Sequence, residues 1–131
     1  MKHFVHYWRA RLPNKKIYFC YETYYCICNF VNNFASNYGG AVYFNGTGEV
    51  ANCNFVNSSA SNRGGAVYFN STGGVSYCNF NNNQVNEEDN SYGGAVFMSS
   101  GSVENCNFTN NKAPVYGGAI YFSISGSTHT V

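Results

Sequence analysis

The chain has 131 residues, which is enough for one domain, and its seven Lys and Arg face six Asp and Glu for a net charge of +1. Charged residues make up only 10% of the sequence, which excludes a nucleic-acid binder held by a broad basic surface, because affinity for phosphates needs clustered Lys and Arg. The aromatic content of 18% excludes a charged disordered chain, and no apolar run reaches the roughly 18–20 residues that span a bilayer.

Residues 1–27 form a basic, aromatic-rich segment with five Lys and Arg and one Glu, a balance of +4. The segment is not typical of a secretory signal, because His, Arg, Pro and Lys interrupt its apolar stretch and no small-residue cleavage site follows. Two interpretations stay open. Either the aromatic stretch 17–27 caps one end of the following domain, or the segment is a start that is not native to that domain.

Residues 28–131 contain four copies of one repeat unit, which predict coils at 28–52, 53–77, 78–105 and 106–131. Each copy begins with Cys-Asn-Phe and carries a second anchor, Gly-Gly-Ala followed by Val or Ile. The third copy is longer because the insertion 86–89 lies between its two anchors. Length changes that avoid both anchors indicate that the anchors are regular structure and the intervals are loops.

The composition of the unit predicts an all-β fold. Gly pairs, Asn runs and aromatic residues suit strands and turns rather than helical repeats. Three short apolar pieces and three polar turns in 25–28 residues describe one coil of a parallel β-helix (a β-solenoid), stacked at about 4.8 Å. A propeller blade needs about 40 residues and fits poorly. We therefore expect a β-solenoid of about four coils.

Equivalent positions of successive coils should form columns along such a stack. We place the Cys-x-Phe columns and the Val/Ile and Phe/Met columns after the Gly pair inside, and the intervening Ala and Tyr outside by strand alternation, while the opposite assignment stays open. The Gly pairs are expected at corners that need special backbone shapes. A further column is expected to adopt left-handed corners and to hydrogen-bond along the stack; its members are Asn32, Asn57, Asn82 and Asn110.

These two motifs, Gly-Gly-Ala-Ile/Val and Phe-x-x-Asn, carry a family resemblance over residues 28–131. The chain resembles the repeats of the polymorphic outer-membrane proteins of chlamydiae and the related adhesin-like repeats of methanogenic archaea and some protists. Phe55-Val56-Asn57-Ser58 departs from the second motif at its last position. The resemblance implies a right-handed parallel β-helix in a cell-surface or extracellular protein that mediates adhesion.

The cysteines admit three interpretations. Cys28, Cys53, Cys78 and Cys106 share one column, where neighbours lie at a spacing that a disulfide can bridge. A reduced buried ladder is favoured, one or two bridges are the alternative, and a metal takes most of the remainder. Structural zinc needs ligands around a point with suitable geometry, whereas this column is a line without His. We therefore expect no metal and no cofactor.

Catalysis is not expected. A β-helix glycosidase or lyase needs two carboxylates, or an acid with a basic partner, on one face. The three consecutive acids Glu87, Glu88 and Asp89 fit a solvated turn, and Glu49 and Glu104 are separated by a whole coil. No nucleophile elbow or phosphate-binding loop is present in the sequence. A carbohydrate-active enzyme whose catalytic coils lie outside this chain is the alternative function, and a truncated, nonfunctional product is a third.

Two kinds of surface site are predicted. An aromatic column is favoured as a ladder whose rings stack to stabilise the coils, and the alternative, if it faces outward, is a surface strip that suits sugars and partner proteins. This strip consists of Tyr43, Tyr68, Phe97 and Tyr121. A second strip would allow Arg63 to stack between rings; its members are Tyr38, Arg63, Tyr92 and Tyr116. Among the N-glycosylation sequons, those at Asn45 and Asn70 lie in Gly/Ser/Thr turns and are the credible sites.

The sequence therefore predicts a non-catalytic, adhesin-like repeat module. The expected partner is a surface protein or glycan of a host or neighbouring cell, and no nucleic acid or membrane span is expected. Open strand edges at the ends of a four-coil stack also predict end-to-end self-association.

Overall fold

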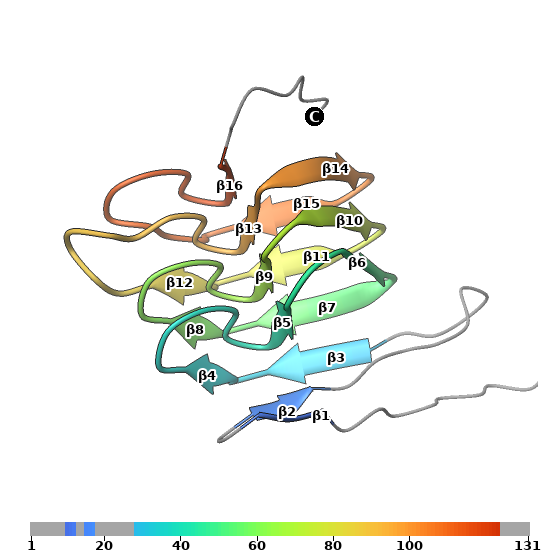
Figure 1. Ribbon diagram of the computed structural model, residues 1–131, viewed down its shortest axis with the longest axis horizontal. Helices are drawn as coiled ribbons and strands as arrows, with labels where there is room; N and C mark the ends of the chain where they lie inside the picture. The colour runs from blue at the N-terminus through green and yellow to red at the C-terminus, as the bar shows by residue number, and fades with distance from the viewer. Residues whose placement is uncertain (1–9, 13–14, 18–27, 124–131) are drawn as a thin grey trace, which may run out of the picture.

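The computed structural model describes residues 10–12, 15–17 and 28–123, and these residues contain β-strands and no helix (Figure 1). β1 (Ala10–Leu12) and β2 (Lys15–Ile17) pair with each other as an antiparallel hairpin. Residues 18–27 and 124–131 lie outside the described residues, and so does the cap predicted from the stretch 17–27 apart from residue 17. Residues 28–123 form a parallel β-solenoid of about four turns, which confirms the predicted fold class.

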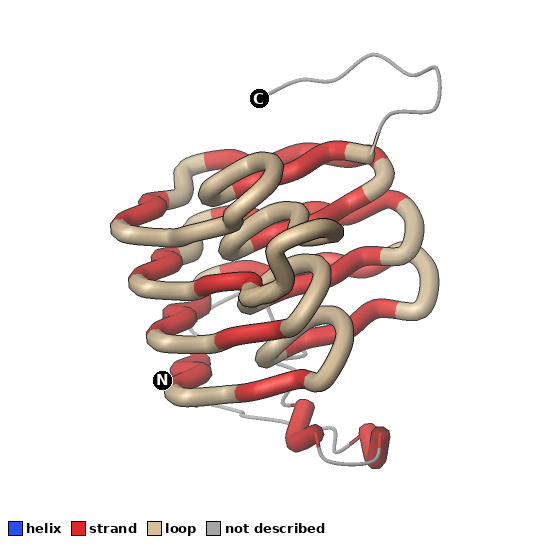
Figure 2. The backbone as a smooth tube through the Cα atoms, turned by 90° about the vertical axis from the view of Figure 1, so that its left-hand side faces the viewer, coloured by secondary structure: helices blue, strands red, loops and turns tan. Residues whose placement is uncertain are grey.

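Four parallel sheets run along the stack, and each coil contributes strands to them in turn (Figures 1 and 2). The first three coils add a fourth strand of two residues, which the sequence did not predict. The strands, sheet by sheet, are β3 (Cys28–Val31), β7 (Cys53–Val56), β11 (Asn79–Asn81) and β15 (Asn107–Thr109); β4 (Phe34–Ala35), β8 (Ser59–Ala60) and β12 (Gln84–Val85); β5 (Val42–Phe44), β9 (Val67–Phe69), β13 (Val96–Met98) and β16 (Ile120–Phe122); β6 (Gly48–Ala51), β10 (Thr72–Ser76) and β14 (Ser100–Glu104).

The strand register confirms the predicted columns. Cys28 pairs with Cys53, Val42 with Val67, and Phe80 with Phe108. The strand register is the same before and after the insertion in the third coil, because the extra residues form a loop between β12 and β13. Their loop is exposed and is held to coil two by backbone bonds from the N–H groups of Asn86 and Glu87 to Ser61 C=O, the latter at 2.9 Å.

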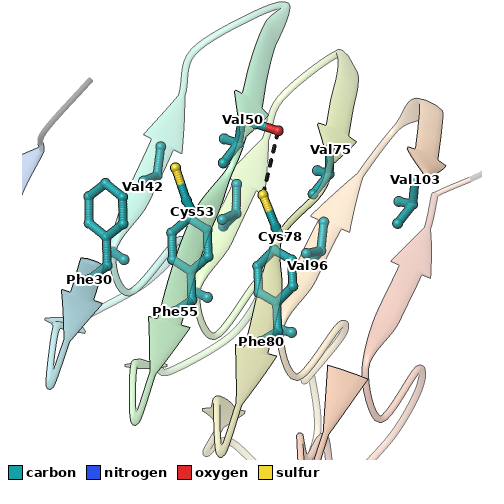
Figure 3. Packing of buried hydrophobic residues seen from close by; sticks show 14 of the residues in the cluster. Phe30, Val42, Val50, Cys53, Phe55, Val75, Cys78, Phe80, Val96 and Val103 are labelled. Atoms are coloured by element: carbon teal, nitrogen blue, oxygen red, sulfur yellow. Dashed lines mark hydrogen bonds between the residues drawn. The ribbon is translucent and has the colours of Figure 1, made fainter. Parts of the chain in front are cut away.

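The interior is filled by the expected aromatic and aliphatic columns (Figure 3). The rings of Phe30, Phe55, Phe80 and Phe108 stack with 4.8 Å between successive centroids and interplanar angles of 1–5°. The Val column and the Phe/Met column of β5, β9, β13 and β16 also face inward, which confirms the chosen assignment. The Ala before each of these strands was expected outside, but Ala41, Ala66 and Ala95 are buried in the same core, because the chain bends at that residue rather than continuing a regular strand.

The two glycines of each pair have different tasks. The first adopts a left-handed conformation, with φ of 59–68° at Gly39, Gly64, Gly93 and Gly117. The second allows the next coil to approach, because a Cβ on Gly65 or Gly94 would lie only 2.0–2.1 Å from the carbonyl oxygen of the following pair. The prediction that the Gly pairs form corners is therefore confirmed. The first glycine is required for its left-handed backbone, and the second is required for the close approach of the next coil.

The last residue of the Phe-x-x-Asn motif links adjacent coils. Asn83 is fully buried; its Nδ2 donates to Phe55 C=O at 3.0 Å and its Oδ1 accepts from Ser58 N–H at 2.9 Å. Asn111 repeats this pattern one coil later on Phe80 and Asn83. At the deviating position, the Ser58 hydroxyl is buried and makes no hydrogen bond.

A second set of asparagines forms a ladder on the outer face of the β3–β7–β11–β15 sheet. Each Nδ2 donates to the Oδ1 of the preceding coil at 2.8–2.9 Å, through Asn29, Asn54, Asn79 and Asn107. The column predicted to hydrogen-bond in this way instead serves the corners, where Asn32, Asn57, Asn82 and Asn110 have φ of 54–57°. The left-handed corners are thus confirmed, and the outer amide ladder lies one column away from where it was expected.

Candidate functional site

The outer side of β5, β9, β13 and β16 carries the predicted aromatic strip. The rings of Tyr43, Tyr68, Phe97 and Tyr121 stack on one another with centroids 5.1–5.6 Å apart and interplanar angles of 12–20°. Tyr68 and Phe97 are only 5% and 3% exposed, and Tyr43 and Tyr121 are half-buried. The ring faces are not an open strip, because the turn of the preceding coil folds over them.

The covering residues are the second predicted strip, here called the Tyr/Arg strip: Tyr38, Arg63, Tyr92 and Tyr116. Each coil contributes one of these four residues, and each residue forms a parallel β-bridge with its equivalent in the next coil. Tyr38 stacks on Tyr68 at 4.8 Å, and the Arg63 guanidinium carbon lies 5.2–5.6 Å from the ring centres of Tyr38, Tyr92 and Phe97. The predicted stacking of Arg63 between rings is therefore present.

The two aromatic columns form one layer that is accessible at its outer edge. Tyr38, Arg63 and Tyr92 are half-buried, and Tyr116 is 57% exposed. Burial raises the pKa of Tyr68 above its usual value, and the charge of Arg63 opposes that effect in part. Because the ring faces are occupied by neighbouring rings, the layer offers ring edges, hydroxyl groups and one guanidinium to a ligand rather than a flat platform.

The cysteine column lies inside the coil. Cys28 is disulfide-bonded, whereas Cys53, Cys78 and Cys106 are free thiols. Each free thiol donates to the carbonyl two residues earlier at 3.1–3.2 Å, and Cys78 also lies 3.7 Å from Val50 C=O (Figure 3). The hydrogen bond with Cys106 lowers the pKa of Cys78, but the hydrogen bond with Cys53 and burial outweigh it and raise the pKa to about 12. Cys78 is therefore a protonated packing group at neutral pH, whereas the hydrogen bond with Cys78 lowers the pKa of Cys53.

The acidic residues are spread over the surface. Glu87, Glu88 and Asp89 are exposed in the inserted loop, and the Asn62 side chain of coil two donates to Asn37 Oδ1 at 2.7 Å. Glu49 and Glu104 lie on the same sheet but in different columns, since Glu49 aligns with Gly74 and Glu104 with Ser76. Within residues 28–123, no group of three or more His, Cys, Asp and Glu is placed to hold a metal ion. His3, His6 and His129 lie outside the described residues.

The two credible glycosylation sequons occupy adjacent rungs of one exposed turn. Asn45 and Asn70 are both exposed, and Asn70 Nδ2 donates to Asn45 Oδ1 at 3.3 Å. Asn70 Oδ1 also accepts from the Tyr68 hydroxyl at 3.3 Å. Modification of either side chain stays a prediction, and a glycan on Asn70 would be attached to the same Nδ2 that donates to Asn45.

Comparison with known protein families gives a match to the fourth coil. Residues 105–123 match the family model of the Chlamydia polymorphic membrane protein repeat. The match contains both motifs, from Cys106-Asn107-Phe108 to Gly117-Gly118-Ala119-Ile120, and thereby confirms the resemblance seen in the sequence. Neither the curated proteins nor the solved structures give a match to this chain. The residues that the structure describes form no helix long and apolar enough to cross a membrane.

Proposed function

We propose that this chain is a non-catalytic, adhesin-like repeat module of a cell surface, which attaches to a surface protein or glycan of a host or neighbouring cell. The observation that carries the proposal is the polymorphic membrane protein repeat in coil four. The same two motifs recur in register in coils one to three, so the whole solenoid is built from that repeat. The name of the matched family supports, coarsely, a location at a cell surface or outer membrane.

The Tyr/Arg strip is the surface to which we assign attachment. Tyr and Arg are enriched in protein interfaces, because they combine a large apolar area with hydrogen-bonding groups, and Tyr loses little conformational entropy on binding. Here the rings are already ordered by stacking, and Arg63 is held between three of them. A partner would therefore meet a rigid row of hydroxyl groups and ring edges, which suits hydrogen bonds to a protein loop or to glycan hydroxyls.

Attachment can be tested with beads that carry the full chain and are applied to cultured epithelial cells. The test variant is Tyr116→Ala, because this side chain is 57% exposed and its removal leaves the buried rings in place. The matched control is Tyr77→Asn, which removes an equally exposed tyrosine from another corner. Asn fits there, because Asn52 and Asn105 adopt the same left-handed conformation in the neighbouring coils.

We expect beads with the unchanged chain to bind cells, Tyr116→Ala to reduce the bound fraction, and Tyr77→Asn to leave it unchanged. Circular dichroism of both variants verifies that the solenoid is intact. An equal loss of cell binding by both variants would mean that the attachment surface is not the Tyr/Arg strip. Absence of binding by the unchanged chain, on cells that bind a known adhesin, would contradict the attachment role itself.

A further inference from the structure

The turn between β5 and β6 contains the single Asn-Gly step of the sequence, Asn45-Gly46. Asn45 is exposed, and a Cβ placed on Gly46 would meet no atom within 4 Å. Gly46 has a φ of 139°, a backbone conformation that residues with a side chain rarely adopt. No side chain therefore lies between the carboxamide carbon of Asn45 and the backbone nitrogen of the residue that follows it.

The backbone N–H of Gly46 donates to no acceptor among the residues that the structure describes. The N–H group that follows Asn57 differs, because Ser58 N–H donates to the buried Asn83 Oδ1 at 2.9 Å. Such a hydrogen bond fixes the nitrogen and retains its proton, whereas an N–H group at an exposed turn can lose its proton to hydroxide. The Gly46 nitrogen is therefore a candidate nucleophile next to a carboxamide.

Coil two provides an internal comparison, because Asn70-Ser71 occupies the same turn. Asn70 is held at both ends of its amide: Nδ2 donates to Asn45 Oδ1, and Oδ1 accepts from the Tyr68 hydroxyl, each at 3.3 Å. Within the described part of the chain, Asn45 is bonded only through Oδ1. Both carboxamide carbons are polarised by the bond that Oδ1 accepts, but only Asn70 is also fixed at its nitrogen. The Asn45 carboxamide is therefore the less restrained of the two.

This turn also tolerates a change in length. Val67 and Gly73 of coil two align with Val96 and Gly101 of coil three, so the turn is one residue shorter in coil three. The strands on either side keep their register despite this difference. A product that lengthens the backbone at position 45 by a single carbon atom can therefore fit between β5 and β6.

We propose that Asn45 is a deamidation site of the folded chain. The deprotonated Gly46 nitrogen attacks Asn45 Cγ, the new N–C bond closes a succinimide ring, and Nδ2 takes up a proton and leaves as ammonia. Water then opens the ring at either of its carbonyl groups, which gives aspartate or isoaspartate at position 45. The reaction removes the nitrogen to which a glycan would be attached, so N-glycosylation and deamidation are alternative outcomes at this sequon.

Deamidation is measured on the full chain, produced in a bacterial host so that neither sequon carries a glycan and incubated in mildly alkaline buffer. Peptide mass spectrometry follows the conversion at Asn45 and Asn70 separately, and methylation by an isoaspartate O-methyltransferase detects the isoaspartate product. The test variant is Gly46→Ser, which reproduces the Asn-Ser step of coil two, where Ser71 shows that the turn accepts a side chain. Asn45→Ser is the control that assigns the methylation signal, since Ser99 lies in this turn in coil three.

We expect the Asn45 amide to be lost at least about tenfold faster than the Asn70 amide, and Gly46→Ser to slow the loss at position 45 at least about tenfold. The methylation signal should disappear in Asn45→Ser, and the circular dichroism of the converted chain should match that of the fresh chain.

Equal rates at Asn45 and Asn70 in the unchanged chain would overturn the proposal, and this comparison needs no variant. A rate at Asn45 that Gly46→Ser leaves unchanged, while its circular dichroism shows an intact fold, would overturn it as well. Conversion accompanied by loss of the solenoid's circular dichroism would have the same meaning, because the reaction would then belong to the unfolded chain.

Discussion

Replacing Ser58 by Asn should stabilise the protein, although it enlarges a fully buried side chain. The substitution restores the Phe-x-x-Asn motif at the one coil that departs from it. In the present chain the Ser58 hydroxyl is buried without a hydrogen-bond partner. Asn83 and Asn111 show what the amide does at this position, because each bonds both to the Phe carbonyl and to the backbone N–H of the preceding coil.

The size of the effect follows from these contacts. Asn at position 58 would donate to the Phe30 carbonyl and accept from the Asn33 N–H, as Asn83 does with Phe55 and Ser58 at 3.0 and 2.9 Å. Each bond contributes a net free energy of about 0.5–1.5 kcal/mol, and the buried unsatisfied hydroxyl, which costs about 1–3 kcal/mol, is removed. Ordering the amide and fitting the larger side chain into a filled site together cost about 1–3 kcal/mol. We expect the free energy of unfolding to rise by about 1–3 kcal/mol.

Equilibrium unfolding in urea measures this change. With a slope of about 2 kcal/mol per molar urea, the unfolding midpoint should rise by about 0.5–1.5 M. The matched control is Ser59→Gln, which enlarges the adjacent residue on the outer face, where Gln84 occupies the same column; its effect should stay within about 0.5 kcal/mol. A midpoint of Ser58→Asn at or below that of the unchanged chain would refute the reasoning, since it would mean that the motif asparagine does not hold the coils together.

Three further outcomes are expected. Phe55→Ala should lower the free energy of unfolding by about 3–5 kcal/mol, because the ring is fully buried in the Phe stack, and a loss below about 0.5 kcal/mol in urea unfolding would contradict that burial. Gly94→Ala should destabilise by more than about 2 kcal/mol, because its Cβ would collide with a carbonyl of coil four, whereas Gly118→Ala should be near neutral; equal effects on the thermal midpoint would be inconsistent with this difference. Stability should fall as the pH rises above the ordinary pKa values of Cys and Tyr, because the folded-state pKa values of Cys78 and Tyr68 are raised and both groups are neutral in the fold, while the lowered pKa of Cys53 acts in the opposite direction; a urea midpoint unchanged between about pH 8 and pH 11 would exclude a net linkage of this sign.

The repeat alone predicts much of this fold, because in-register stacking turns sequence spacing into contact. Once Cys28 and Cys53 are taken as equivalent, the Phe, Val and Gly columns follow without further assumption. The burial of Tyr68 and Phe97 could not be derived in this way, because it depends on how the turn before each Gly pair folds over the strand of the next coil. The strand alternation that placed these rings on the outside was correct, but alternation does not say what covers an outer face.

The outer amide ladder was missed even though its signal was present. Every coil has Asn at the second position of Cys-Asn-Phe, on the opposite face from the two buried neighbours. A polar residue repeated in register on an outer strand face predicts a ladder, whereas the Asn that follows the strand is placed where the chain turns and its left-handed backbone takes priority. An Asn within the strand therefore joins the amide ladder, whereas an Asn just after the strand end forms a left-handed corner.

The amide ladder and the Gly-Gly-Ala turns also determine how charge is distributed along the solenoid axis. In the ladder, every amide group donates toward the first coil, so its positive end lies there. In the turns, every N–H group donates toward the fourth coil, so the positive end of that row lies at the opposite end. The two rows of aligned dipoles oppose each other, unlike the peptide dipoles of an α-helix, which sum along its axis. Each added coil extends both rows, by four N–H groups in the turn and one amide in the ladder, so the ladder offsets only part of the dipole that the turns build up along the axis.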